Sequence, residues 1–382
     1  MTTAASASPS SGFTCSGSSP TSPISAASAE TLHPSLASTY SPSSIPTLHL
    51  LGPGKVGRAF LERIARLPLR LLAVSDSTGT LFDPRGLEPR AVAAFKSRGG
   101  SLGPHHGGLA ISTEDGLALV GADLVIDATP TDLAQPEIAA SRCRSILDRG
   151  ARLALAAKDA LCFAGEDLLS PRNHSRVGLN AVLGGTGAHL TAEMADLRAT
   201  CTAVEIVGNA STTALIEEIE AGRSRQEGIA SATRRGLLET DPAQDLDGSD
   251  AAVKLSIVVR ALWGFPLSPA DVAKLNLHAL DPDLLRERRD RRSTTRLIGR
   301  ASRDGSFSLA YEEIPRGSHL AVPSDRVVYA YKTGRGLRVH VGSGLGPEGT
   351  AEALLADVLA LARGLGRASA RSFETVVAGG VA

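Results

Sequence analysis

The chain has 382 residues, which is enough for two domains, and its 40 basic side chains are balanced by 40 acidic ones. A protein that binds nucleic acid or a membrane surface would show a basic excess, so we expect neither partner. The four cysteines form no CxxC pair, and no apolar run reaches the length of about 18 residues that a membrane helix needs. We therefore expect a reducing, cytoplasmic location.

Residues 1–46 differ in composition from the rest of the chain. They contain 15 serines and six prolines, their only acidic residue is Glu30, and the first basic residue of the chain is Lys55. Such a segment cannot bury enough apolar surface to offset its ordering entropy, so we predict a disordered tail. A transit peptide is the alternative, although it would carry arginines and this segment has none.

The first predicted elements are a strand, a glycine-rich loop and a helix. The strand covers residues 47–51, a GxGxxG loop follows it, and apolar residues then recur at helical spacing. Gly52 permits the tight turn, Gly54 lets the backbone approach a pyrophosphate, and Gly57 lets the helix pack close to the strand. The helix N-terminus then faces the phosphates of a dinucleotide cofactor. The residues that we expect to bind this cofactor are Gly52, Gly54, Lys55, Val56 and Gly57.

Three later strand-like segments end in residues that can serve a ligand. The segment LRLLAVSDS reaches Asp76, GADLVIDATPT reaches Thr129, and GARLALAAKDAL reaches Lys158. Apolar strands that alternate with helical stretches predict an α/β domain with a parallel, doubly wound, Rossmann-like sheet, whose ligands bind at the carboxyl ends of the strands. Asp76 favours NAD because an acid there bonds the ribose hydroxyls, whereas Arg58 could pair with the 2′-phosphate of NADP, so the choice stays open.

The stretch ETDPAQDLDGSDAAVKL, residues 239–255, holds five acidic residues ahead of one lysine. Asp250 and Lys254 are four positions apart and therefore share one face of a predicted helix. Two interpretations are open at this point. The stretch is either a solvated acidic loop with a surface ion pair, or a polar pocket for a small zwitterion.

With these motifs in this order, the chain resembles the homoserine dehydrogenase family over about residues 47–365. The resemblance runs from the glycine loop and the strand-end Lys158 through NAVLGGTG at 180–187 to GSGLGPEGTA at 342–351. Its most specific part is the block at 236–255. The family pattern in that block is filled by Gly236, Glu239, Asp241-Pro242, Asp245-Leu246, Gly248, Asp250 and Lys254.

The resemblance implies an activity, the NAD(P)-dependent interconversion of L-homoserine and L-aspartate 4-semialdehyde in threonine and methionine biosynthesis. It implies that Lys254 exchanges a proton with the alcohol oxygen and that Lys158 lies near cofactor and substrate. Glu239 and Asp250 would hold the ammonium and hydroxyl ends of the substrate, with Asp245 close to them. The chemistry agrees, because hydride transfer to an aldehyde leaves charge on oxygen, which a positioned acid must quench.

The chain departs from the family pattern at several positions. GNASTT at 208–213 stands where the family has Asn-Gly-Thr-Thr-Asn-Tyr, and Leu237 replaces a frequent tyrosine. A related dehydrogenase for another small amino or hydroxy acid therefore stays open, as does a nucleotide-binding sensor without catalysis. Asn180 replaces a family glutamate at a candidate site for a monovalent cation. That site would use Asn180 and the carbonyls of Leu183, Gly185 and Gly187.

Four segments follow from this interpretation. We expect a tail at 1–46, a dinucleotide-binding domain at 47–178, and an α+β substrate and dimerisation domain at 179–341. Residues 342–382 would return to the cofactor domain, with Gly344 and Gly346 close to the cofactor; this segment is too short for the family's regulatory domain, so we expect no allosteric amino-acid site. The strand-like pieces at 179–188 and 325–341 resemble the family's dimerising sheet, so we expect a homodimer.

The arginine-rich run at 285–300 is interleaved with Glu287 and Asp290, which is typical of a solvated helix face. Aromatic residues make up 3% of the chain, which leaves no stacking platform for bases.

Overall fold

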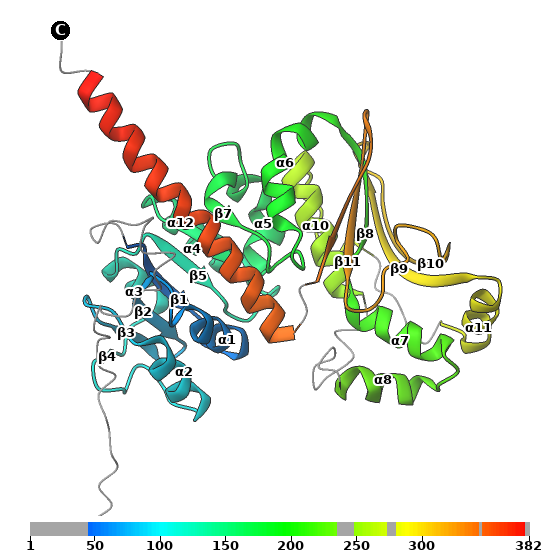
Figure 1. Ribbon diagram of the computed structural model, residues 1–382, viewed down its shortest axis with the longest axis horizontal. Helices are drawn as coiled ribbons and strands as arrows, with labels where there is room; N and C mark the ends of the chain where they lie inside the picture. The colour runs from blue at the N-terminus through cyan, green and yellow to red at the C-terminus, as the bar shows by residue number, and fades with distance from the viewer. Residues whose placement is uncertain (1–44, 235–247, 273–279, 344–345, 379–382) are drawn as a thin grey trace, which may run out of the picture.

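The computed structural model describes residues 45–234, 248–272, 280–343 and 346–378, and beyond residue 365 it describes the backbone alone. Two domains stand side by side, each built around its own sheet (Figure 1). Within the described ranges, no helix is both long and apolar enough to cross a membrane.

The first domain is built on a seven-stranded sheet with the order β4-β3-β2-β1-β5-β6-β7. Strands β2, β1, β5, β6 and β7 are parallel, whereas β3 and β4 pair antiparallel at one edge. The α/β prediction is confirmed, with the correction that the edge beyond β2 is antiparallel because the chain turns back directly after Asp76. The strands are β1 (Thr47–Leu51), β2 (Arg70–Asp76), β3 (Gly79–Phe82), β4 (Gly108–Leu109), β5 (Leu124–Asp127), β6 (Arg152–Leu155) and β7 (Val177–Gly178).

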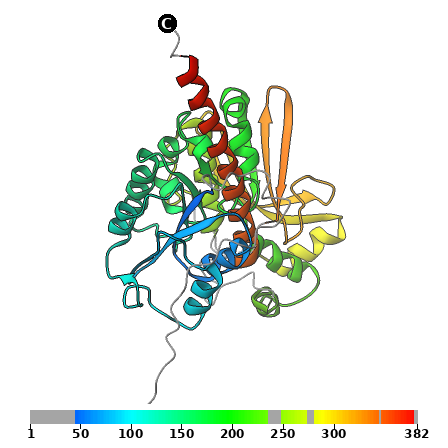
Figure 2. The same ribbon diagram turned by 60° about the vertical axis from the view of Figure 1, so that its left-hand side comes forward.

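The long C-terminal helix α12 (Gly346–Ala378) lies across this first domain beside α1 (Figures 1 and 2). Its residues Leu354 and Val358 share one buried core with Leu50 and Phe60. The C-terminal segment is thus part of the first domain's core. The other helices here are α1 (Lys55–Ile64), α2 (Pro89–Ser97), α3 (Thr113–Leu119), α4 (Pro136–Asp148), α5 (Asp159–Leu168) and the short 3-10 helix η2 (His174–Arg176).

The second domain is built on a five-stranded antiparallel sheet with the order β10-β9-β8-β11-β12. Its strands are β8 (Cys201–Val207), β9 (Ser293–Ser302), β10 (Phe307–Pro315), β11 (Val327–Thr333) and β12 (Gly336–Gly342). Its helices are α6 (Gly187–Thr200), α7 (Ala210–Glu220), α8 (Arg225–Arg234), α10 (Ser249–Trp263) and α11 (Pro282–Asp290).

Helix α10 is the central helix between the two domains. It begins after Gly248 and ends before Gly264, both in the left-handed conformation with φ of 86° and 72°. All residues from 251 to 262 are buried, so the helix packs against neighbours on every side. Lys254 and Arg260 are consequently buried cations, and a buried charge requires partners.

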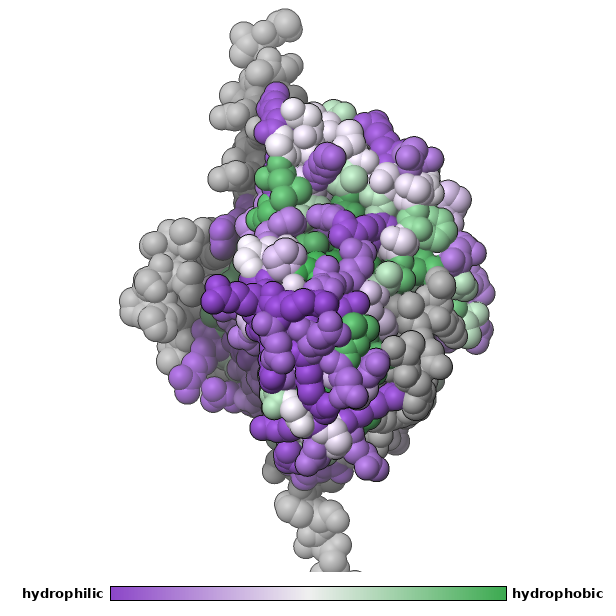
Figure 3. Space-filling model, turned by 90° about the vertical axis from the view of Figure 1, so that its right-hand side faces the viewer, coloured by the Kyte–Doolittle hydropathy of each residue, from purple (hydrophilic) through white to green (hydrophobic). Residues whose placement is uncertain are grey.

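Two predictions about segments need correction. Residues 180–186 form a turn, not a strand, because Gly184 and Gly185 have positive φ of 60° and 85°. The arginine run is helical only to Asp290; it then enters β9, where Arg296 is buried and donates to the Val322 carbonyl at 3.0 Å. The solvated face belongs to α11 and β10, over which the surface is predominantly hydrophilic (Figure 3).

Candidate active site

The three glycines of the loop after β1 stand at their positions for different structural reasons. A β-carbon on Gly52, whose φ is +77°, would collide with the Ala128 carbonyl at the end of β5, and one on Gly57 would collide with the Gly52 carbonyl. The fold itself therefore requires these two glycines. A β-carbon on Gly54 would meet nothing within 4 Å, although Gly54 is the N-cap of α1. This open space above a helix N-terminus fits the phosphates of a dinucleotide, and Lys55 and Val56 form the first turn beside it.

Asp76 ends β2, at the position expected for a ribose contact, but its carboxylate is engaged inside the protein. One oxygen accepts from Lys96 Nζ at 2.5 Å and from the Leu102 N–H at 3.2 Å. The other accepts from the Thr78 N–H at 2.8 Å and the Thr78 hydroxyl at 2.5 Å. Burial acts to raise the pKa of Asp76, but these hydrogen bonds outweigh it and the pKa is lowered. A ribose hydroxyl would have to share the carboxylate with these donors.

Thr129 and Lys158 follow neighbouring strands at the same edge of the sheet. The Thr129 hydroxyl donates to Asp127 at 2.5 Å and its N–H donates to the same oxygen at 3.1 Å, so its side chain shapes the turn after β5. Lys158 is the N-cap residue of α5, and its N–H donates to the Thr131 hydroxyl at 3.2 Å. Because the carboxyl ends of parallel strands lie together, both residues are on the same edge as the glycine loop.

The structure brings together three predicted residues that are far apart in sequence. Lys158 Nζ lies 2.9 Å from one oxygen of Asp250, and Lys254 Nζ lies 2.7 Å from the other. Lys254 also donates to the carbonyl of Gly208 at 2.5 Å, between β8 and α7. The cluster thus joins the N-terminus of α5, the first turns of α10 and the β8–α7 connection. We call these four residues the lysine cluster.

Burial and charge set the state of the lysine cluster. Burial acts to raise the pKa of Asp250, but the charges of Lys158 and Lys254 outweigh it, so the pKa lies well below its usual range and the carboxylate stays ionised. The Lys254 side chain is 10% exposed and that of Lys158 is 27% exposed. One carboxylate between two ammonium groups can orient both of them.

Several predicted site residues cannot be placed in this geometry. Glu239 and Asp245, together with Leu237, lie outside the described residues, as does Gly344. Gly346 has a positive φ of 65° and begins α12. In the stretch 208–213, which departs from the family pattern, the Asn209 side chain caps α7 by accepting from the Thr212 N–H at 2.9 Å.

Most oxygens of the candidate cation site accept hydrogen bonds within the protein. The Asn180 side-chain oxygen accepts from the Ala188 N–H at 2.7 Å, so it caps α6. The Leu183 carbonyl accepts from the Thr186 hydroxyl at 2.8 Å, and the Gly187 carbonyl from the Thr191 hydroxyl at 2.9 Å. Three of the four expected oxygens, all except Gly185, thus serve hydrogen bonds within the protein, and a cation plays no part in the mechanism below.

Sequence reasoning missed three groups near these elements. The Gly208 carbonyl belongs to the lysine cluster and the hydroxyl of Tyr329 borders it; Gly208 begins the GNASTT stretch, but no motif marks its carbonyl or Tyr329 as part of a site. Asp357 of α12 accepts from the Asn180 N–H at 2.8 Å, and burial raises its pKa to about 7 despite the hydrogen bonds from Asn180 and Ala181. A signal was present for Asp357, since it is a lone acid within the apolar run LLADVLALA.

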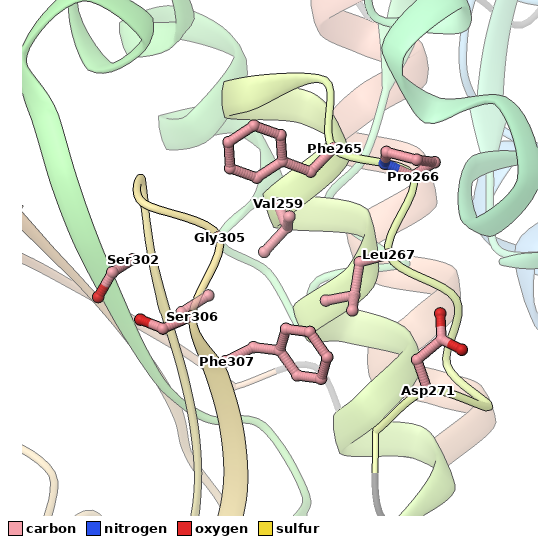
Figure 4. A pocket seen from close by; sticks show the side chains of 10 residues that line it. Val259, Phe265, Pro266, Leu267, Asp271, Ser302, Gly305, Ser306 and Phe307 are labelled. Carbon is pink, nitrogen blue, oxygen red and sulfur yellow. The ribbon is translucent and has the colours of Figure 1, made fainter.

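An apolar pocket of about 220 Å³ lies at the other end of α10 from the lysine cluster. Val259 and Leu267 face Phe265 and Phe307 across it, between the end of α10 and the turn that joins β9 to β10 (Figure 4). Its lining contains no lysine or arginine and no residue of the glycine loop. This pocket is therefore separate from both the glycine loop and the lysine cluster.

A Rossmann-like sheet that carries a GxGxxG loop at its carboxyl edge, and that meets a second domain there through the lysine cluster, is the arrangement of a two-domain nicotinamide-dependent oxidoreductase. The chain is similar to the homoserine dehydrogenase family. The family model named Homoserine dehydrogenase matches residues 190–359. A second model, Glutamate/Leucine/Phenylalanine/Valine dehydrogenase, matches residues 38–144, which include the glycine loop.

Individual proteins show the same likeness. The NAD(+)-dependent homoserine dehydrogenase of Pseudomonas canavaninivorans is 27% identical over 82% of this chain and 95% of the relative. The homoserine dehydrogenase of Methanocaldococcus jannaschii is 26% identical over 76% of this chain and 88% of the relative. Among solved structures, a putative homoserine dehydrogenase from Archaeoglobus fulgidus has a TM-score of 0.69 at 22% identity, covering 82% of this chain and 98% of that one. A hyperthermophilic archaeal homoserine dehydrogenase in complex with NADPH has a TM-score of 0.63 at 21% identity, covering 82% and 96%.

Proposed function

We propose that this protein interconverts L-homoserine and L-aspartate 4-semialdehyde with NAD or NADP, a step of threonine and methionine biosynthesis. The observation that carries the proposal is the lysine cluster. Its two ammonium groups lie on one partly buried carboxylate at the sheet edge where the glycine loop opens. A sensor that only binds a nucleotide gains nothing from such a cluster.

Lys254 is the proton-transfer residue in this proposal. During oxidation its neutral amine takes the proton of the substrate hydroxyl, and during reduction its ammonium group returns that proton to the oxygen. A nicotinamide bound at the glycine loop would supply the hydride chemistry at the carbon that carries the substrate hydroxyl. Asp250 and the Gly208 carbonyl fix the direction of the Lys254 amine, because both accept hydrogen bonds from it.

Lys158 and Asp250 support the same step from the other side. Lys158 follows β6 at the sheet edge that carries the glycine loop, so its charge lies between the cofactor and the substrate. There it stabilises the substrate oxygen that becomes negative during the reaction. Asp250 attracts the substrate's ammonium group by charge while its oxygens hold the two lysines. We assign Glu239 and Asp245 to the remaining polar ends of the substrate.

The test is a steady-state assay of homoserine oxidation and aspartate-semialdehyde reduction, with NAD and NADP in parallel. A panel of 2-amino-4-hydroxy and 2-hydroxy acids covers the possibility that GNASTT and Leu237 change the substrate. We expect the highest kcat/KM with L-homoserine. Cofactor binding without turnover of any panel member would favour the sensor, and a higher kcat/KM for another acid would reassign the substrate.

We also propose a homodimer that forms through the edge strand β12. Leu337, Val339 and Val341 point to the same side of this strand and are 49%, 38% and 48% exposed, which is an unusual row for a free surface. Val339→Glu should convert the dimer to a monomer in light scattering, whereas Leu119→Glu, at an exposed leucine of α3, should not. A monomeric wild type would refute the proposal. The buried free thiols of Cys143, Cys162 and Cys201 agree with the proposed reducing cytoplasm.

A further inference from the structure

Strand β11 contains two tyrosines whose hydroxyl groups are buried without a partner. Tyr329 and Tyr331 are 0% and 1% exposed, and neither hydroxyl makes a hydrogen bond within the described structure. They alternate along one strand, so both rings point to the same face of the antiparallel sheet. Buried hydroxyl groups normally find partners, so each unpaired one needs an explanation.

The two hydroxyl groups have different surroundings. The Tyr329 hydroxyl lies 3.7 Å from the point where a β-carbon of Gly208 would stand, and the δ-carbon of Lys254 lies 3.2 Å from the same point. Tyr329 therefore borders the lysine cluster. The Tyr331 ring instead packs against His340, with centroids 5.8 Å apart, on the side of α6. Of the two tyrosines, only Tyr329 feels the charge of Asp250.

Tyr329 carries a hydrogen-bond donor throughout the working pH range. Burial, with smaller contributions from Tyr331 and Asp250, raises the pKa of its hydroxyl well above the ordinary value, so the proton stays on the oxygen. Burial likewise raises the pKa of Tyr331, with contributions from Cys201 and Glu193. The two side chains thus match in burial, protonation and lack of a partner, and they differ in their distance from the lysine cluster.

We propose that Tyr329 is a positioning residue for Lys254 and that its hydroxyl donates a hydrogen bond to the Lys254 nitrogen when that nitrogen is neutral. The inference rests on the proposed function. In the substrate-free enzyme, when Lys254 loses its proton, the nitrogen has one fewer donor and gains a single lone pair, which the substrate hydroxyl takes over on binding. Before the substrate binds, an adjacent hydroxyl without another partner can donate to this lone pair, and this hydrogen bond favours the neutral amine.

Several groups around Lys254 shift the equilibrium between its charged and its neutral form. Asp250, on the same helix, favours the charged amine, and the Gly208 carbonyl does the same by accepting from it. Lys158, at the start of α5, favours the neutral amine by repulsion through their shared carboxylate. The Cys162 thiol of α5 donates to the Val253 carbonyl, and burial raises its pKa to about 12, so it adds no charge. The hydroxyl of Tyr329 on β11 is a hydrogen-bond donor and therefore favours the neutral amine.

The experiment compares Tyr329→Phe with Tyr331→Phe, because each removes one unpaired buried hydroxyl and keeps the ring. In Tyr329→Phe, the pH profile of kcat/KM for homoserine oxidation should move to higher pH by about 0.5 to 1 unit, the scale of one hydrogen bond. The profile for aldehyde reduction should move in the same direction, since both depend on the same amine. Tyr331→Phe should keep the wild-type profiles. Both variants should melt at or above the wild-type temperature.

A second readout needs no substrate. The chain has six lysines, so 13C-lysine NMR resolves the ε-carbon of Lys254, which is assigned by its loss in Lys254→Met. The titration of this carbon should move to higher pH in Tyr329→Phe and stay unchanged in Tyr331→Phe. Equal titrations in the two variants, or a KM effect in Tyr329→Phe without a shift in pH, would overturn the inference. A wild type that leaves homoserine unoxidised would refute the proposed function alone, and the NMR titration would still decide the role of Tyr329.

Discussion

The glycine loop and the lysine cluster lie at the same edge of the first sheet, but they depend on the sequence in opposite ways. The loop is formed by six consecutive residues, 52–57, and contacts with the neighbouring turn decide its shape. The cluster joins Lys158 to Asp250, which are 92 positions apart, and Lys254 to Gly208, which are 46 apart. A cofactor site can thus be local, whereas the proposed site of proton transfer forms only when α10 is packed between the domains.

The two regions also differ in charge and burial. Gly54 leaves an exposed, uncharged space that the protein does not fill, so changes there should act on ligand binding and leave the fold intact. The lysine cluster is partly buried and charged, so changes there should act on the rate and also on stability. The predictions below test this division, from the largest expected effect to the smallest.

The largest effect is expected for Lys254→Met, which keeps the apolar stem and removes the ammonium group. We expect kcat for homoserine oxidation to fall by about a hundredfold or more, because general acid–base catalysis is lost. Cofactor affinity, measured by fluorescence titration, should stay near the wild-type value. Lys332→Met is the control, since Lys332 is an exposed lysine of β11. A near-normal kcat in Lys254→Met would show that Asp250 and Lys254 form only a structural ion pair.

The second effect concerns Gly54→Ala. Because a β-carbon at this position meets no protein atom within 4 Å, the melting temperature without cofactor should stay within about one degree of the wild type. The added methyl group occupies the space of the pyrophosphate, so the Kd for the cofactor should rise about tenfold or more. Gly121→Ala, at another glycine with no atom within 4 Å, controls for the substitution itself. An unchanged Kd would show that the phosphates bind elsewhere.

A smaller effect, a few-fold change in cofactor preference, should follow from Lys96→Met. Lys96 compensates the charge of Asp76, so its loss leaves a carboxylate that repels a 2′-phosphate. The ratio of kcat/KM with NAD to that with NADP should therefore rise. Arg58→Met is the comparison variant, because Arg58 is the alternative partner that the sequence predicts for the 2′-phosphate. If Arg58→Met raises the ratio and Lys96→Met does not, Arg58 is the determinant.

The smallest effect is a pH dependence of stability from Asp357. Its pKa is about 7 in the fold, against about 3.9 in an unfolded chain, so the folded protein binds an extra proton between these values. Stability should therefore fall as pH rises from about 4 to 7, and the fall should be weaker in Asp357→Asn. His49 acts in the opposite sense, since burial lowers its pKa to about 4. The measurement is thus the difference in melting temperature between variant and wild type at pH 5 and pH 8.

The control for Asp357→Asn is Glu352→Gln, at an exposed acid of the same helix. It should leave the pH dependence of the melting temperature unchanged. The same pH dependence in Asp357→Asn and the wild type would show that Asp357 does not titrate in this range.

The sequence predicts the local parts of this molecule well. The strand Thr47–Leu51, the glycine loop and the start of α1 follow from consecutive residues, and so does Asp76 at the end of β2. The apolar residues that flank the glycines at 180–186 suggest a strand, but Gly184 and Gly185 have positive φ and form a turn, for which the Gly-Gly pair is the signal in the sequence. No spacing rule connects Tyr329 or the Gly208 carbonyl to Lys254, since tertiary packing alone brings them together.

The central claim is that the glycine loop holds the cofactor while Lys254 meets the reacting oxygen. A crystal structure of the wild-type protein with NAD and L-homoserine tests it directly. We predict that the pyrophosphate lies over Gly54 and that the substrate hydroxyl lies within hydrogen-bond distance of Lys254 Nζ. A substrate hydroxyl that is bound to other groups, beyond hydrogen-bond distance of Lys254 Nζ, would contradict the account.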